Sequence, residues 1–535
     1  MRPSGSAIEI YLLNEPTRRI SGPDFLFKTD GVLYTDSHPN VHTGSGAEIA
    51  GQPSGAKGDG IVSAERMCRG IVTHRVVTRP PQTGYTPFVG ESRVMKITYI
   101  SHASYLIESD DRNTSILIDP WLHGATYMDQ FWLAWSFPGT LDSVTAPDFV
   151  LFTHHHKDHF HPPSIEEISK RSEVVVPTTA GHFLRDRVQE FGFSRIHEIA
   201  SVSPLQLGTF EVHSVRINDH RTLLDETGYL IVDGRQAALF LADLWYLPEG
   251  VLRRLCSEFH VCFAAIPWGG SLQDLCVLPD GFRLDSFEAY YQHGMDDATI
   301  RQKSALEAFE GFVRFGNVVD ADYLTPGSFG FGWILPDHDL VQPVPICGWL
   351  DQEQFLQNIP DPGTRAKSHP MYPGDQFDVE GGFRRYERSS SPNTPVTNSM
   401  RSLALSRKHT RIHLDGEFIS QQFLKKLEMR ISQLRSASNH QGRLQEILRG
   451  SRQIEFQIVN ESRQTFLFEQ DAERFRMREV GTPTGAPDIV YIPPSVMVSL
   501  VTDWGPCWTE AEFSGLVKVS ASGWAPYLIM QQMFC

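Results

Sequence analysis

One short segment holds most of the residues that could do chemistry. Four candidate ligands in an H-x-H-x-D-H pattern follow the apolar run 149–153: His154, His156, Asp158 and His159. His154 and His156 lie two residues apart, so in an extended loop both imidazoles point the same way and can share one metal ion. Asp158 and His159, turned by the start of the next helix, can face a second ion. Imidazole and carboxylate ligands suit Zn, Fe or Mn, and paired ions can polarise a substrate and activate water or dioxygen.

The elements expected around this segment alternate between strands and helices. Short β-type runs are expected at 95–100, 105–108, 115–118, 149–153, 173–176, 210–215, 228–232, 237–242 and 261–266. Helix-like segments between or after them are expected at 163–172, 181–192 and 296–315. Strands interleaved with helices in this way predict an α/β layered domain.

Changes in composition along the chain predict four regions. Residues 1–93 have little periodic pattern and include the Gly-rich stretch 40–60, so we expect an N-terminal extension that is partly loop. Residues 94–345 are expected to form the catalytic α/β domain. The basic and Ser/Pro-rich range 346–410 predicts a linker, and 411–535 predicts a small α+β region.

Composition excludes several classes of protein. The 535 residues are 41% hydrophobic and carry a net charge of -16, and an acidic chain is a poor partner for nucleic acid. The seven cysteines show no C-x-x-C or C-x-H spacing, which argues against a zinc ribbon or an iron–sulfur cluster held by this chain. No apolar leader or run of 18 apolar residues occurs, so we expect a cytoplasmic protein without a membrane partner.

The ligand pattern resembles that of the metallo-β-lactamase superfamily, over roughly Met95 to Asp339. The resemblance implies a four-layer αββα sandwich with the metals at one edge. It also implies an aspartate after an early strand, which Asp119 matches, and a bridging aspartate after a later strand, which Asp243 matches. The family usually has a glycine directly before the bridging aspartate, where this chain has Ala242.

The resemblance leaves the remaining ligands less clearly assigned. His220 is the preferred third-motif ligand, because its distance from Asp243 suits a branch with a long insert after this histidine. Glu226 is the alternative, because some oxygen-using members have a carboxylate here. His338 is the candidate for the last ligand, with a plain loop histidine as the alternative. The implied metal set is His154, His156, Asp158, His159, His220, Asp243 and His338, with Asp158 and Asp243 as catalytic residues.

Two further positions could contribute around the metals. Trp268 and Ser271, in the run Trp-Gly-Gly-Ser, are candidates for substrate contact, because glycines allow close backbone approach and the indole offers a flat apolar face. A structural turn with a core tryptophan is the alternative. The family fold places the strand before His102 beneath the site, so His102 is expected to be structural or to support a ligand.

A narrower resemblance is to the CMP-N-acetylneuraminate hydroxylase branch of the superfamily. The shared runs are 97–103, 119–122 and 324–326, the last leading into a Gly-rich turn. That branch carries an N-terminal Rieske domain, whereas residues 1–93 hold only Cys68 and no C-x-H pair. No Rieske cluster is therefore expected in this chain. Either electrons come from a separate protein or the reaction is not redox.

These resemblances imply a dinuclear-metal enzyme that acts on a small molecule, and leave two reactions open. The preferred hypothesis is a non-haem di-iron monooxygenase that hydroxylates a small polar or carrier-bound substrate, with an external electron donor. The alternative is a zinc- or manganese-dependent hydrolase of an ester, phosphoester or lactone. A metal-free binding module is a third hypothesis, against which the intact ligand pattern argues.

Overall fold

The computed structural model describes residues 8–11, 95–333, 352–386, 414–436 and 448–520, with short interruptions and longer ones at 217–225, 269–276, 279–297 and 503–516. The chain divides into two compact units, of which one, Leu13–Glu91, lies wholly outside the described residues. The expected N-terminal extension, with its Gly-rich stretch, therefore lies outside them too, apart from β1 (Ile8–Tyr11).

Two sheets form the centre of residues 95–386. The first has the order β19 (Gly382–Arg384), β18 (Gln376–Asp378), β2 (Lys96–Ser101), β3 (Ser104–Glu108), β4 (Ser115–Ile118), β7 (Phe149–Leu151), β8 (Glu173–Pro177) and β9 (Ile196–Ile199). The second has the order β10 (Leu205–Leu207), β11 (Phe210–Arg216), β12 (Thr227–Asp233), β13 (Gln236–Phe240), β14 (His260–Pro267) and β16 (Tyr323–Gly327).

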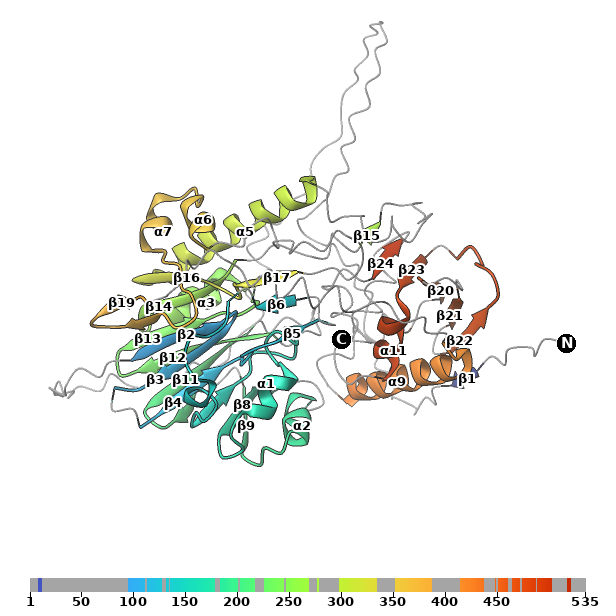
Figure 1. Cartoon of the computed structure of the whole chain (residues 1–535), viewed down its shortest axis with the longest axis horizontal. Coiled ribbons are helices and arrows are strands. Elements are labelled where there is room, and N and C mark those ends of the chain that lie inside the picture. The colour runs from blue at the N-terminus through green and yellow to red at the C-terminus, as the bar shows by residue number, and fades with distance from the viewer. Residues whose placement is uncertain are drawn as a thin grey trace, which may run out of the picture. The chain divides into compact units, whose positions relative to one another are not determined.

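Helices cover the outer face of each sheet, which makes four layers. β4 illustrates the pattern: Ile116 and Ile118 pack in the core between the sheets, and Leu117 packs on the helix side. Helices α1 (Pro162–Glu167) and α2 (Phe183–Glu190) cover the first sheet. Helices α3 (Glu249–Cys256) and α5 (Ala298–Val319) cover the second (Figure 1). The predicted αββα sandwich is confirmed.

Residues 352–386 differ from the expectation, which placed them in the linker 346–410. There the structure has α6 (Gln352–Gln357), α7 (Pro362–Lys367) and the two edge strands β18 and β19. Phe377 of β18 is buried in the core between the sheets. These elements are only three to six residues long, which is too short for a hydrophobic periodicity to be recognised in the sequence. The Ser/Pro-rich stretch itself, at 387–413, lies outside the described residues.

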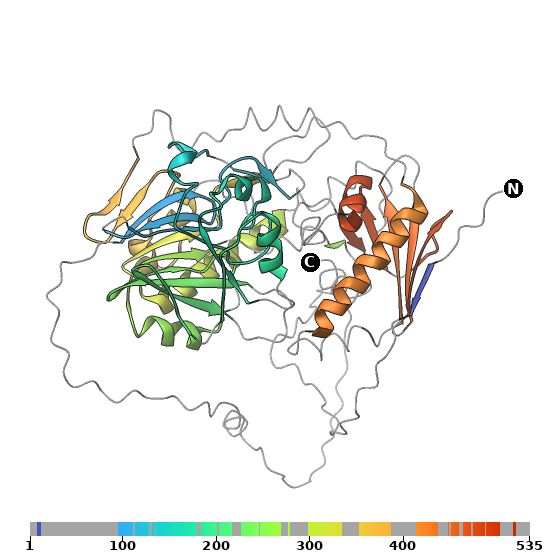
Figure 2. The same ribbon diagram turned by 90° about the horizontal axis from the view of Figure 1, so that it is seen from below.

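Residues 414–520 contribute a separate sheet with its own apolar core. Its order is β1, β22 (Arg474–Val480), β21 (Thr465–Asp471), β20 (Ser451–Ile458), β23 (Asp488–Ile492), β24 (Lys518–Ser520) and β15 (Val277–Leu278). One apolar face of α9 (Gly416–Ser436) is buried against this sheet, together with α11 (Pro494–Thr502) (Figure 2). Among the described residues, no helix is long and apolar enough to span a membrane.

One glycine controls how closely β12 approaches the end of β13. A Cβ atom added at Gly228 would lie 2.7 Å from the carbonyl oxygen of Phe240 and 3.1 Å from Cα of Leu241. Both atoms belong to the backbone that leads into Asp243, so neither can move without shifting that strand end. Gly228→Ala should therefore lower the free energy of unfolding by about 1–3 kcal/mol, measured by urea denaturation.

Gly250 in α3 supplies the matched control, because a Cβ added there has no heavy atom within 4 Å. Gly250→Ala should leave stability unchanged or raise it by up to about 1 kcal/mol, because alanine is the better helix former. If Gly228→Ala unfolds at the same urea concentration as the wild type, the two strands do not approach as closely as described.

Candidate metal centre

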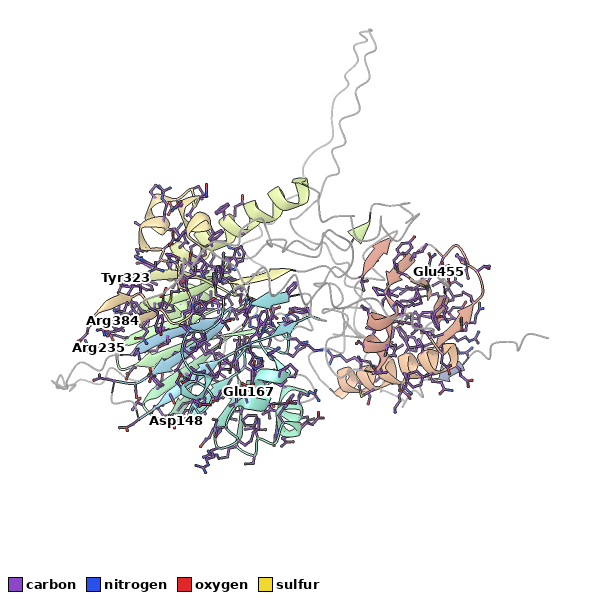
Figure 3. All side chains as sticks on the ribbon, viewed as in Figure 1. Asp148, Glu167, Arg235, Tyr323, Arg384 and Glu455 are labelled. Atoms are coloured by element: carbon purple, nitrogen blue, oxygen red, sulfur yellow. The ribbon has the colours of Figure 1, made fainter. Side chains whose placement is uncertain are left out.

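The ends of three strands bring the chemistry-bearing residues together. Asp119 follows β4, the H-x-H-x-D-H segment follows β7, and Asp243 follows β13 by three residues. β4 and β7 are parallel neighbours, so their carboxyl ends meet at one edge of the sheet. Asp148 lies at the opposite end of β7, just before the strand begins (Figure 3). It accepts hydrogen bonds from the N–H and hydroxyl of Ser115, each 2.8 Å, and so fixes the register of the two strands.

Asp119 is a buried carboxylate that orients two histidines. Its Oδ1 accepts the N–H of Thr153 at 2.8 Å, and its Oδ2 accepts the Thr153 hydroxyl at 2.6 Å and Nδ1–H of His159 at 2.7 Å. Because the Thr153 hydroxyl donates to Asp119, it can only accept from Nδ1 of His154, 2.9 Å away. Both histidines are therefore held with Nδ1 outward and Nε2 toward the centre, as metal-binding histidines commonly are.

The described candidate ligands fall into two groups. His154, His156 and Asp243 form one group, and His102, Asp158 and His159 form the other. Within each group, one ligand atom from each residue lies within 4.8 Å of the others. The structure therefore brings together all four residues of the H-x-H-x-D-H pattern, with the two early histidines in one group and the later pair in the other.

Asp243 lies between the two groups. Its Oδ1 is 3.3 Å from Nε2 of His159, and its Oδ2 is 3.7 Å from Nε2 of His154. The hydroxyl of Ser328 donates to the same Oδ1 at 3.0 Å. One carboxylate oxygen thus faces each group, which is the position that a bridging ligand needs.

Backbone strain is concentrated at this site. Six non-glycine residues in the described part of the chain have positive φ, and five of them belong to the site or contact it: His102, Asp119, Tyr127, Ala242 and Ser328. Left-handed backbone costs an L-residue about 1–2 kcal/mol, so a cluster of such residues indicates a functional constraint. Ala242 has φ 47°, which explains why the family has a glycine there.

Opposite charges in the cluster shift each other's pKa. Burial alone would lower the pKa of His159. The negative charges of Asp243, Asp158 and Asp119 outweigh burial and raise this pKa well above its usual value. Despite burial, the positive charge of His159 lowers the pKa of both Asp158 and Asp243. Burial, with His159 and His156 nearby, lowers the pKa of His154 and keeps it as the neutral imidazole that binds metal.

Glu226 adds another carboxylate to this cluster. It directly precedes β12, where Tyr229 pairs with Phe240 of β13. Glu226 lies close enough to Asp243, Asp158 and His159 for their charges to act on its carboxylate. Burial, followed by the negative charges of Asp243 and Asp158, raises the pKa of Glu226 to about 8. The excess of carboxylates over histidine cations is what a bound cation would neutralise.

The environment of one imidazole nitrogen, Nε2 of His159, also fits a metal centre. Nε2 of His159 is buried, is 3.6 Å from Oδ2 of Asp158, and has no hydrogen-bond partner among the described residues. An imidazole nitrogen buried in this way beside two carboxylates is a ligand set that suits Fe, Zn or Mn. The site can therefore hold two cations side by side.

Other predicted residues lie elsewhere or outside the described part. His220, His338 and Ser271 are outside it. Trp268 is 2% exposed; its indole N–H donates to the carbonyl of Ser328 at 2.9 Å and its ring packs on Phe329. The structure thus has the core tryptophan, the alternative to substrate contact.

Two supporting hydroxyls, those of Tyr127 and Ser328, were not predicted from the sequence. The Tyr127 hydroxyl donates to Oδ1 of Asp158 at 2.5 Å. Oδ2 of Asp158 accepts Nε2–H of His102 at 3.0 Å, so His102 supports a ligand, in keeping with one of the two roles expected for it. The positive φ of Tyr127 and Ser328 is a signal that only a structure can supply.

Comparisons with known proteins bear on the same residues. Residues 96–243 match the family model of the beta-lactamase superfamily domain. A UPF0173 protein of Pyrococcus furiosus is 32% identical over 155 residues, which is 29% of this chain and 62% of that protein. The cytidine monophosphate-N-acetylneuraminic acid hydroxylase of Asterias rubens is 29% identical over 175 residues, 30% of this chain and 26% of that protein.

The chain thus covers less than two thirds of the length of these relatives. Among solved structures, the diiron β-hydroxylase CmlA from Streptomyces venezuelae aligns with 54% of this chain and 54% of its own, at 19% identity and a TM-score of 0.34. The matched family model ends at Asp243, the residue that faces both ligand groups. Residues 96–243 are therefore similar to the beta-lactamase superfamily domain, and they lie within a metallo-β-lactamase-like αββα fold.

Proposed function

We propose that the protein is a dinuclear non-haem iron monooxygenase that hydroxylates a small polar or carrier-bound substrate. The observation that carries the proposal is a third carboxylate, that of Glu226, close enough to Asp243 and Asp158 for their charges to act on it. A site with three carboxylates is richer in negative charge than one completed by histidine. Additional carboxylates stabilise the more highly charged, oxidised state of iron, and carboxylate-rich sites are typical of di-iron proteins.

The similarity to the Asterias rubens hydroxylase supports the same proposal, because that relative is named for a hydroxylation. The similarity covers only part of each chain, so it extends to the reaction class and not to the substrate. The absence of C-x-H spacing in the sequence means that electrons would come from a separate donor protein.

Each residue of the site has a defined part in this proposal. His154 and His156 would hold one ion and Asp158 and His159 the other, with Asp243 between them and Glu226 as the carboxylate of the third motif. Asp119 keeps His159 and His154 in the tautomer that presents Nε2. When bound, the two irons would supply activation of dioxygen. His338 remains a predicted ligand, and His220 is the alternative to Glu226 in the third motif.

The two-histidine pair provides the first test. His154→Ala with His156→Ala should remove one of the two metal ions, because both imidazoles belong to one ligand group. Metal content is measured by mass spectrometry of protein purified without added metal, and folding by circular dichroism.

The matched control is His197→Ala with His213→Ala. These histidines pair with surface glutamates, so the control should keep both ions and its fold. If the His154/His156 variant also keeps both ions, the assignment of this pair is wrong.

The third-motif ligand gives a second test. Glu226→Gln keeps the size of the side chain but removes its charge, and should lower iron affinity by about 10-fold or more. His220→Ala should leave iron affinity unchanged if Glu226 is the ligand. The opposite pattern, measured by competition with a chromogenic chelator, would assign the third motif to His220 and remove the main support for an iron site.

The reaction class can be tested without knowing the substrate. Protein as isolated should contain more iron than zinc, and the iron form, reduced and then exposed to dioxygen, should consume oxygen in an electrode assay. The zinc-loaded protein is the control and should consume none. Turnover of model esters, phosphoesters or lactones by the zinc or manganese form under anaerobic conditions would instead support a hydrolase.

A further inference from the structure

A small third sheet stands at the metal side of the sandwich. It has the order β17 (Phe331–Trp333), β6 (Phe131–Leu133) and β5 (Ala125–Thr126) (Figure 1). Its two outer strands come from segments about 200 residues apart in the chain, and antiparallel pairing through β6 joins them. No ligand pattern in the sequence falls on this sheet.

Tyr127 directly follows β5 and reaches the metal cluster. Its side chain is buried, its φ is 49°, and its ring lies 4.7 Å from that of Phe131 at an interplanar angle of 63°. The hydroxyl donates to Oδ1 of Asp158, while His102 donates to Oδ2. One oxygen of Asp158 is thus held by Tyr127, from outside the ligand groups, and the other by His102 of its own group, so the carboxylate cannot rotate freely.

Ser328 lies in the turn that leads from β16 into β17, and its hydroxyl holds Asp243 as that of Tyr127 holds Asp158. Its φ is 53° and its hydroxyl donates to Oδ1 of Asp243. Its carbonyl accepts the indole N–H of Trp268, whose ring lies 4.1 Å from that of Phe329. The backbone of Ser328 is therefore anchored in the core on one side and aimed at the carboxylate on the other.

The two hydroxyls converge on one side of the cluster. Oδ1 of Asp243, which accepts from Ser328, is the oxygen that faces His159. Asp158, which accepts from Tyr127, belongs to the same ligand group as His159. Neither hydroxyl donates to the imidazoles of His154 and His156, and Oδ2 of Asp243, which faces His154, is not the oxygen that accepts from Ser328.

We infer that the three-stranded sheet is a positioning element for the metal ion at His159, and that Tyr127 and Ser328 are its positioning residues. The inference rests on the metal centre proposed above but not on which metal it holds. A hydroxyl that donates to one lone pair of a carboxylate directs the remaining lone pairs at the ion. Loss of such a supporting hydrogen bond typically lowers metal affinity 10- to 100-fold.

The experiment uses the full chain, stripped of metal and titrated with Co²⁺, whose visible absorption reports coordination. Tyr127→Phe and Ser328→Ala each remove only a hydroxyl and leave the ring or the Cβ in place. Each should weaken one of the two Co²⁺ equivalents by 10- to 100-fold and change its visible spectrum. Both should affect the same equivalent, the one that survives in the His154/His156 variant.

The matched control is Tyr105→Phe, which removes another buried phenol hydroxyl. The hydroxyl of Tyr105 has no hydrogen-bond partner among the described residues, and its ring packs between the sheets against Phe240. This variant should titrate like the wild type. Urea unfolding of each metal-free protein measures any general loss of stability separately.

The possible outcomes separate the two proposals. Wild-type affinity and spectrum in Tyr127→Phe and Ser328→Ala would overturn the inference alone. Equal weakening of both Co²⁺ equivalents, or loss of fold in the metal-free variants, would make the hydroxyls structural and overturn it as well. A wild-type protein that binds no Co²⁺ would overturn the proposed metal centre and the inference together.

Discussion

The metal centre depends first on one buried carboxylate, Asp119, which is not itself placed to bind an ion. It accepts from the backbone and hydroxyl of Thr153 and from Nδ1–H of His159. Through Thr153 it also fixes His154, so one side chain sets the tautomers of histidines in both ligand groups. Because burial makes an unpaired carboxylate costly, Asp119 holds these donors firmly, and the loop after β7 has little freedom to reorganise.

The fold supports this arrangement by delivering each residue at a strand end. β4, β7 and β13 all stop at the same edge, where the chain must turn sharply away from the sheets. Left-handed backbone at Asp119 and Ala242 makes the turns after β4 and β13, and Ser328 makes a similar turn after β16. The strain persists because the strands before these residues are buried on both faces. Their packing fixes where each turn must begin, so the turn cannot relax to another conformation.

The sequence predicts this site to the extent that its residues are close together or follow strands. The H-x-H-x-D-H spacing predicts the division into two ligand groups, because it depends only on local geometry. It cannot predict Tyr127 or Ser328, which reach their carboxylates through the tertiary structure. The sequence favours His220 over Glu226 by its distance from Asp243 along the chain, whereas the closeness of Glu226 to Asp243 and Asp158 depends on the tertiary structure. The strands β18 and β19 are too short to display a period, so residues 352–386 were expected in the linker.

The charges of the cluster explain how the protein can assemble this site before any metal arrives. The imidazole of His159 is surrounded by Asp119, Asp158 and Asp243. Burial lowers its pKa, but the negative charges of these carboxylates outweigh burial and raise it, which favours a proton on Nε2. A metal ion uses the same nitrogen, and ligands must lose their protons to bind it. The imidazolium thus stabilises the neighbouring carboxylates, and a metal ion bound at Nε2 would take the place of its proton.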